Sequence, residues 1–89
     1  MNMSTKVSIN PNFQFQWEEK QDCYVLLYPE GMVQLSQSAG EILNLCDGEN
    51  TVDSITNKLE VKFSTSGLKD DIIDFIDDAM KRNWVIYAN

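Results

Sequence analysis

Five aspartates crowd one short segment of the chain: Asp70, Asp71, Asp74, Asp77 and Asp78. Carboxylates four residues apart on a helix lie on one face and can share a cation, so this spacing could build a metal or acid–base site. Helical di-metal sites, however, combine such carboxylates with Glu-x-x-His motifs, and the chain contains no histidine. We therefore interpret the aspartates as the solvated face of a helix, and we expect no metal and no cofactor.

The two cysteines, Cys23 and Cys46, are the other candidates for chemistry. They lack the Cys-x-x-Cys spacing of a zinc or redox site, so we interpret both as small buried hydrophobes and leave a disulfide between them open. The chain also lacks a Gly-rich phosphate loop and a cysteine paired with a base. Without these groups nucleophilic and acid–base catalysis are disfavoured, and we expect a protein that is not an enzyme.

Composition limits the partners. The 89 residues are 43% apolar, which predicts one folded domain with a modest core. Seven basic residues face fourteen acidic ones, for a net charge of −7. This balance disfavours nucleic acids and anionic membranes, because both bind mainly through Lys and Arg. Residues 1–10 lack a signal-peptide core and no apolar run approaches the roughly 20 residues that span a bilayer, so we expect a cytoplasmic protein.

The aspartate helix must be positioned by the elements that precede it. Residues 1–11 have no periodicity and predict a flexible N-terminal tail before a single domain over residues 12–89. Residues 13–17 alternate apolar and polar, which predicts an edge strand with Phe13, Phe15 and Trp17 on one face. Residues 23–28 are apolar on both faces, as in a central strand, and a turn over 29–31 leads to a third strand over 32–35. We predict a three-stranded antiparallel sheet.

Helical periodicity begins after residue 36. Ser38 and Glu41 have the spacing of a capping box, and Gly48 stands where a left-handed C-cap is expected. Thr51 can cap a second helix over 52–61, and a third helix is predicted over 68–83. Residues 84–87 fit either a helix end or a short strand. The fold class is α+β, with the three-stranded sheet followed by three helices.

The third helix has an apolar arc that is wider than one core contact requires. Its core-facing part consists of Leu68, Ile72, Phe75, Ile76 and Ala79. Ile73 and Met80 extend this arc on one shoulder, beside Lys69 and Asp77. Two interpretations are open: these side chains pack under the C-terminal segment, or they form the wall of a groove.

A three-stranded meander leaves two edge strands, whose unpaired N–H and C=O groups can accept an extended peptide. The residues alone do not choose between the first and the third strand as the binding edge. An open edge can also pair with a second copy of the chain, so a homodimer stays open.

Several segments in this order resemble the PqqD family of pyrroloquinoline quinone (PQQ) biosynthesis. They are Phe15-x-Trp17, the hairpin VLLYPEGMV over 25–33, SAGEIL over 38–43 with Asp47-Gly48, and DDIxxF over 70–75. The resemblance implies a winged-helix-like domain that acts as a RiPP recognition element. Such a peptide chaperone binds the precursor peptide PqqA and presents it to the radical SAM enzyme PqqE, which crosslinks a glutamate and a tyrosine of that peptide. The chain departs from the family at 8–12, without an arginine-rich lead-in, and at 64–67, without the usual proline.

The resemblance also implies which edge is used, because in this fold the peptide adds beside the third strand and lies against the third helix. Carried over to this chain, the strand residues are Met32, Val33, Gln34 and Leu35. The helix residues are Lys69, Ile73, Asp77 and Met80.

The alternative function is a winged-helix nucleic-acid-binding or transcriptional regulatory domain. It rests on the short Ser/Thr/Gly turn between the second and third helices, as in a helix-turn-helix. Its recognition helix would carry the five aspartates, which phosphate repels.

Overall fold

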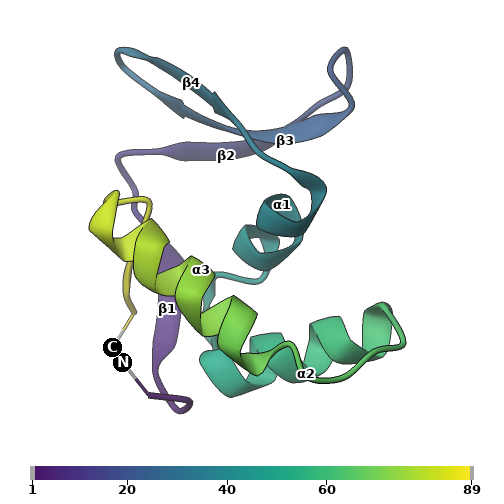
Figure 1. The fold of residues 1–89 in the computed structure, drawn as a ribbon. Coiled ribbons are helices and arrows are strands. Elements are labelled where there is room, and N and C mark those ends of the chain that lie inside the picture. The colour runs from purple at the N-terminus through teal and green to yellow at the C-terminus, as the bar shows by residue number, and fades with distance from the viewer. Residues whose placement is uncertain (1, 89) are drawn as a thin grey trace.

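The structure, a computed structural model, describes residues 2–88. Met1 of the predicted tail and Asn89 of the predicted domain lie outside these residues. Over this range the chain forms two three-stranded antiparallel sheets and three helices (Figure 1), so the α+β fold class is confirmed. The elements are β1 (Lys6–Ile9), β2 (Gln14–Glu18), β3 (Cys23–Tyr28), β4 (Gly31–Gln34), α1 (Gln37–Asn44), β5 (Asp47–Thr51), α2 (Val52–Lys62), α3 (Lys69–Lys81) and β6 (Val85–Tyr87).

The predicted meander is present as the sheet β2-β3-β4, with β3 in the centre. Trp17 pairs with Tyr24 across β2 and β3, and Leu26 pairs with Val33 across β3 and β4. Val25 and Leu26, which point to opposite faces of β3, are both fully buried. The apolar run on both faces therefore indicated the central strand correctly.

A second sheet, β5-β1-β6, was not predicted. The prediction of a flexible tail over residues 1–11 is wrong for residues 6–9, which form the central strand of this sheet, with Val7 fully buried in the core. Four residues of alternation are too few to indicate a strand, and the pairing partners lie about 40 and 80 residues further along the chain. The open question at 84–87 is resolved in favour of a strand, β6.

Helix α1 begins differently from the prediction. Ser36 is the N-cap, and its hydroxyl accepts a hydrogen bond from the backbone N–H of Ala39 at 3.2 Å. The predicted capping box of Ser38 and Glu41 is therefore wrong: Ser38 lies inside the first turn, and the Glu41 carboxylate pairs with Lys62. Two serines two residues apart offer the same cap chemistry, and the end of β4 decides between them.

The end of α1 also differs. Leu45 is its C-cap, whereas Gly48 lies in β5 with φ +86°. The need for glycine at a left-handed position was predicted correctly, but the element that uses it was not.

The second and third helices agree closely with the predictions. The Thr51 hydroxyl accepts a hydrogen bond from the backbone N–H of Ser54 at 3.0 Å at the start of α2, and α3 lies inside the predicted 68–83. Helix α1 packs on β3, α2 packs on α1 and α3, and α3 packs on β6. The helices thereby join both sheets into one core, and α3 crosses the front of the molecule (Figure 1).

Candidate functional site

Strand β4 has one free edge, because β3 is its only partner within the described chain. The backbone N–H of Leu35 donates to the carbonyl of Tyr24 at 3.0 Å, and the register pairs Leu26 with Val33. Backbone groups of successive residues in an antiparallel pair point to alternate sides. The N–H and C=O of Val33 therefore face β3, and those of Met32 and Gln34 face outward.

The side chains of this strand alternate across the sheet in the same way. Leu35 is buried and Val33 is partly buried against the core, whereas Met32 is 41% exposed. Gln34 is exposed, and its amide donates to the side chain of Gln21. The strand thus combines an anchored inner face with outward backbone groups at two positions.

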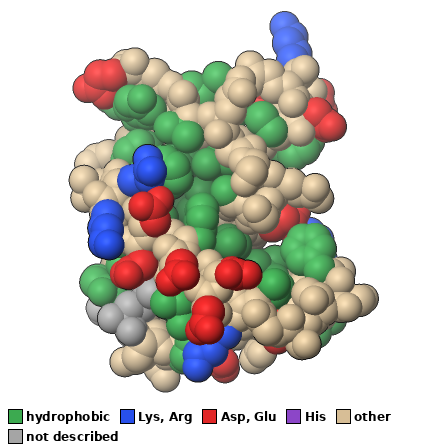
Figure 2. Space-filling view, viewed as in Figure 1, with side chains coloured by type: hydrophobic (Ala, Val, Ile, Leu, Met, Phe, Trp, Pro, Cys, Tyr) green, Lys and Arg blue, Asp and Glu red, His purple; other side chains and the backbone are tan. Residues whose placement is uncertain are grey.

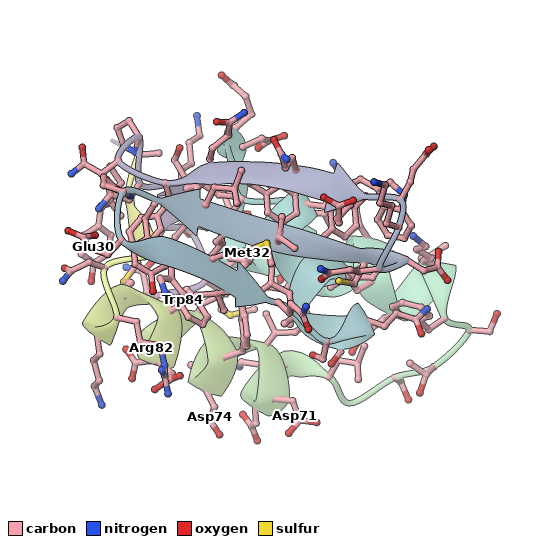
Figure 3. All side chains as sticks on the ribbon, turned by 90° about the horizontal axis from the view of Figure 1, so that it is seen from above. Glu30, Met32, Asp71, Asp74, Arg82 and Trp84 are labelled. Carbon is pink, nitrogen blue, oxygen red and sulfur yellow. The ribbon has the colours of Figure 1, made fainter. Side chains whose placement is uncertain are left out.

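Strand β4 is the strand of its sheet that lies on the α3 side in the view from above (Figure 3), and α3 crosses the same front face below that sheet (Figure 1). Its residues Ile73 and Met80 are partly buried at the margin of the core, as is Val33 of β4. Lys69 and Asp77 are exposed. The structure therefore brings the two predicted walls to one face, and Ile73 and Met80 keep part of their surface in solvent.

Acidic side chains border this apolar face along α3. Figure 2 shows hydrophobic side chains gathered between the β2-β3-β4 sheet and a row of acidic side chains where α3 crosses the front. The five α3 aspartates are exposed, and Asp71 and Asp74 point away from β4 (Figure 3). Asp78 pairs with Arg82 at 2.8 Å. The face is thus an apolar strip with an acidic border.

Sequence reasoning missed a cavity of about 280 Å³ among the three helices. It is lined by Ser38, Ile42, Leu59, Phe63, Leu68, Asp71, Ile72 and Phe75. The helical periodicity assigned Leu68, Ile72 and Phe75 to the core, and the end of α2 left Phe63 without a role. Phe63 is 43% exposed at the rim. A large aromatic residue directly after a helix and before a Ser-rich turn was the available signal.

The two cysteines are not bonded to each other. Both are free, so the disulfide left open by the sequence is absent from the structure. Burial, with a smaller contribution from the charge of Asp47, raises the pKa of the Cys46 thiol to about 12, which keeps it protonated at neutral pH. Its S–H donates to the carbonyl of Ile42. Cys46 therefore behaves as a buried hydrophobe.

Within residues 2–88, no group of three or more Cys, Asp or Glu side chains is placed to hold a metal ion. None of the helices in this range has the length and hydropathy of a membrane span.

Fold and site together define a small α+β domain that exposes a strand edge and an amphipathic helix on one face (Figure 1). A family model described as Coenzyme PQQ synthesis protein D (PqqD) matches residues 23–85. The chain belongs to the PqqD family, as the sequence motifs predicted.

Curated relatives match nearly the whole chain. A PqqA binding protein from Methylococcus capsulatus is 42% identical over 81 residues, covering 91% of this chain and 87% of the relative. A PqqA binding protein from Pseudomonas aeruginosa (strain PAO1) is 49% identical over 74 residues, covering 82% and 80%.

Solved structures share the fold. The solution structure of the PqqD truncation of Methylobacterium extorquens PqqCD, described as a functional and stand-alone RiPP recognition element, aligns with TM-score 0.78 at 23% identity, over 97% of this chain and 94% of that one. The heterocyclase TruD aligns with TM-score 0.71 at 22% identity, over 93% of this chain but 11% of TruD. The recognition-element fold implied by the resemblance is thus confirmed.

Proposed function

We propose that this chain is a non-enzymatic peptide chaperone of PQQ biosynthesis that binds the precursor peptide PqqA by strand addition to β4. The observation that carries the proposal is the free β4 edge, with outward backbone groups at Met32 and Gln34 on the same face of the molecule as the apolar shoulder of α3 (Figure 1). The relatives named for PqqA binding support the choice of peptide.

The geometry supports an extended peptide. Its backbone pairs with the outward groups of Met32 and Gln34, and alternate side chains then point toward α3. Ile73 and Met80 are separated by seven residues, a rise of about 10 Å along the helix. A peptide of five residues spans about 16 Å, which matches this rise plus the reach of the two side chains.

The two charged residues of the α3 wall, Asp77 and Lys69, favour particular peptide side chains. Asp77 is exposed between Ile73 and Met80 on α3 and favours a basic or hydroxyl-bearing peptide side chain. Lys69 lies one turn before Ile73 and favours an acidic one. Because these opposite charges lie at different positions along α3, they favour one orientation of the bound peptide.

We further propose that the bound peptide is presented to the radical SAM enzyme PqqE, which crosslinks its glutamate and tyrosine. In this scheme the chain holds the peptide extended, and the enzyme performs the chemistry. A reducing cytoplasm is the proposed location, and the free thiols of Cys23 and Cys46 fit this environment.

Two proline substitutions test the edge. Gln34→Pro removes an outward N–H, so PqqA affinity by calorimetry should fall about tenfold or more while the melting temperature stays near the parent value. Val33→Pro removes an N–H that faces β3, so it should mainly lower the melting temperature.

The outcomes separate the parts of this proposal. If Gln34→Pro binds PqqA as tightly as the parent, β4 is not the binding edge. If the parent chain does not bind PqqA, the proposed function is wrong. A molar mass of the protein in solution that rises with protein concentration and falls when PqqA is added would indicate a homodimer that uses the same edge.

A further inference from the structure

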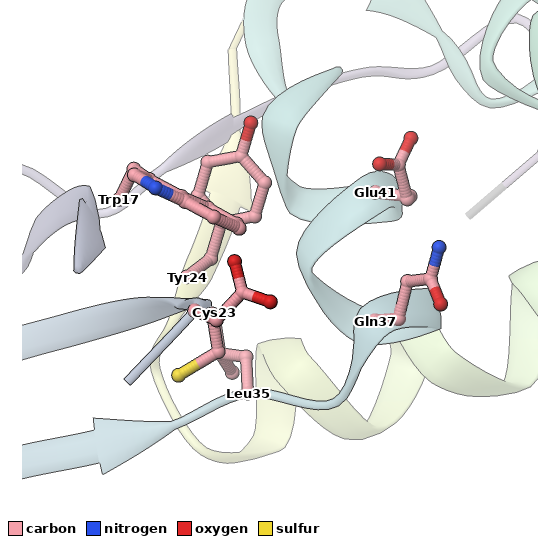
Figure 4. Close-up of a pocket in the computed structure, with 7 residues that line it drawn as sticks. Trp17, Cys23, Tyr24, Leu35, Gln37 and Glu41 are labelled. Carbon is pink, nitrogen blue, oxygen red and sulfur yellow. The ribbon is translucent and has the colours of Figure 1, made fainter. Parts of the chain in front are cut away.

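A second concave site lies between the β2–β3 hairpin and α1. This pocket of about 280 Å³, here called the Trp17 pocket, is shown in Figure 4. It is lined by Trp17, Asp22, Cys23, Tyr24, Leu35, Gln37 and Glu41. The strand-addition site does not use its aromatic or acidic members.

The aromatic side of the pocket is a fixed platform. Trp17 is 48% exposed, and its ring meets Tyr24 edge-on with centroids 5.0 Å apart. Tyr24 in turn stacks on Phe15 at 4.7 Å. The indole is thus held by its neighbours while about half of its surface stays accessible to a partner.

An indole face attracts cations, and arginine most often fills that role. This chain contains an internal example, because the guanidinium of Arg82 lies 5.3 Å from the ring centroid of Trp84. Among residues 2–88 the other cation–π contact joins Lys62 to Phe63. No described cation therefore lies over Trp17.

The remaining walls are polar and acidic. Asp22 comes from the loop between β2 and β3. Gln37 and Glu41 come from α1, on the opposite side of the pocket from Trp17 (Figure 4). None of the lining residues is basic. Glu41 pairs with the largely exposed Lys62, whereas neither ion pair within the described range involves Asp22. A cation that enters the pocket thus meets a carboxylate without an ion-pair partner in the described chain.

The Trp17 pocket is separated from the free edge of β4. Trp17 lies on β2, two strands away from β4, which is about 10 Å at the usual strand spacing. Leu35 borders the pocket, but its backbone N–H is bonded to Tyr24 and does not face the free edge. A peptide on β4 therefore leaves the pocket open.

We propose that the Trp17 pocket receives an arginine side chain of a second protein, the enzyme that acts on the peptide held at β4. The guanidinium stacks on Trp17 and donates to the Asp22 carboxylate and to the side chains of α1. Planar, bidentate donors suit this combination better than the point charge of lysine. Trp, Tyr and Arg are also the residue types that dominate protein–protein hot spots. This inference rests on the proposed function, because that function supplies the second protein.

A small probe tests the chemistry of the pocket. Nα-acetyl-arginine amide is titrated into the chain while the indole N–H resonances of its two tryptophans are followed, with Trp84→Phe used for assignment. The Trp17 resonance should move with saturation, and the isosteric but neutral Nα-acetyl-citrulline amide should not move it. Asp22→Asn should weaken the arginine response at least threefold, whereas Glu19→Gln in the same hairpin loop should not. Equal responses to both probes, or no response at Trp17, would contradict the proposal.

The enzyme itself provides the second test. Affinity for PqqE is measured in the presence of PqqA for the parent, for Trp17→Leu and Asp22→Asn, and for the control Glu19→Gln. The two pocket variants should bind PqqE at least fivefold more weakly and bind PqqA within twofold of the parent. Unchanged PqqE affinity in both pocket variants would overturn the inference and leave the proposed function standing. Absence of PqqA binding by the parent would refute the proposed function instead.

Discussion

The two sheets of this domain are built in opposite ways. The β2-β3-β4 sheet uses one continuous stretch of chain, residues 14–34, whereas the β5-β1-β6 sheet joins strands from the beginning, the middle and the end. The first sheet has a free edge at β4, on the same face as α3 (Figure 1). The second sheet pairs β1, near the start of the chain, with β6, near its end. We infer from this comparison that the two sheets have different roles. The local sheet offers backbone and side-chain groups to binding partners, and the non-local sheet mainly contributes to the stability of the fold.

Removing β1 is the strongest test of this division. Deleting residues 2–9 removes the buried Val7 and the carbonyls of Met3 and Thr5, which accept hydrogen bonds from the first N–H groups of α2. A domain of this size is stable by on the order of 5 kcal/mol, so we expect the cooperative thermal transition to disappear. The exposed Ser4→Ala is the control and should change stability by less than about 0.5 kcal/mol. A truncated chain that melts like the parent would show that β1 is dispensable.

Ile73→Asp tests the peptide-binding role proposed for β4 of the local sheet and for α3. An unpaired carboxylate buried by the bound peptide should weaken PqqA binding by about 2 kcal/mol or more, roughly 30-fold, while the free domain loses less because Ile73 is partly exposed. Calorimetry and a melting curve measure the two quantities. Val61→Asp places the same charge on a valine that is 80% exposed and should leave binding unchanged. If Ile73→Asp abolishes folding, Ile73 is ordinary core and is not a groove wall.

The N-cap of α1 lies between the local sheet and the helices. We expect its removal to have an intermediate effect on the free energy of unfolding. Ser36→Ala removes the acceptor of the Ala39 N–H and should cost about 1 kcal/mol in urea denaturation. Ser38→Ala, two residues away on the exposed surface, should cost a few tenths of that amount. The reverse order would restore the capping box inferred from the sequence.

The smallest predicted effect is the contribution of Asp47, in β5 of the non-local sheet, to the pH dependence of stability. Hydrogen bonds from the backbone N–H groups of Asn50 and then Glu49 hold the pKa of the Asp47 carboxyl below its ordinary value of 3.8. A depressed pKa in the folded state stabilises the domain above the unfolded pKa, and this contribution is lost as the pH falls through the folded value. Because the carboxyl is largely exposed, the contribution should stay well below 1 kcal/mol. The stability difference between the parent and Asp47→Asn should therefore be small at pH 7 and shrink further below pH 4, as urea denaturation at the two pH values would measure.

Local patterns in the sequence determined much of the fold. The period-two alternation at Phe13–Trp17, the apolar run of β3 and the Thr51 cap each depend on neighbouring residues, and each element lies where it was predicted. The family followed from the motifs over residues 15–75, and the family model confirms it. The strand edge and the α3 wall are present on one face, but their use as a peptide site stays a prediction.

Tertiary structure alone decided the rest, because it depends on pairing between distant segments. The strand identity of Lys6–Ile9 comes from β5 and β6, and no periodicity within four residues can indicate such partners. The choice of Ser36 over Ser38 as a cap depends on where β4 ends, and the place of Gly48 depends on β5. The Trp17 pocket exists because the hairpin and α1, which are separate local elements, meet across a buried sheet face. The sequence therefore determined elements whose hydrogen bonds and apolar faces are local, and only the packed chain determined which surfaces those elements leave open.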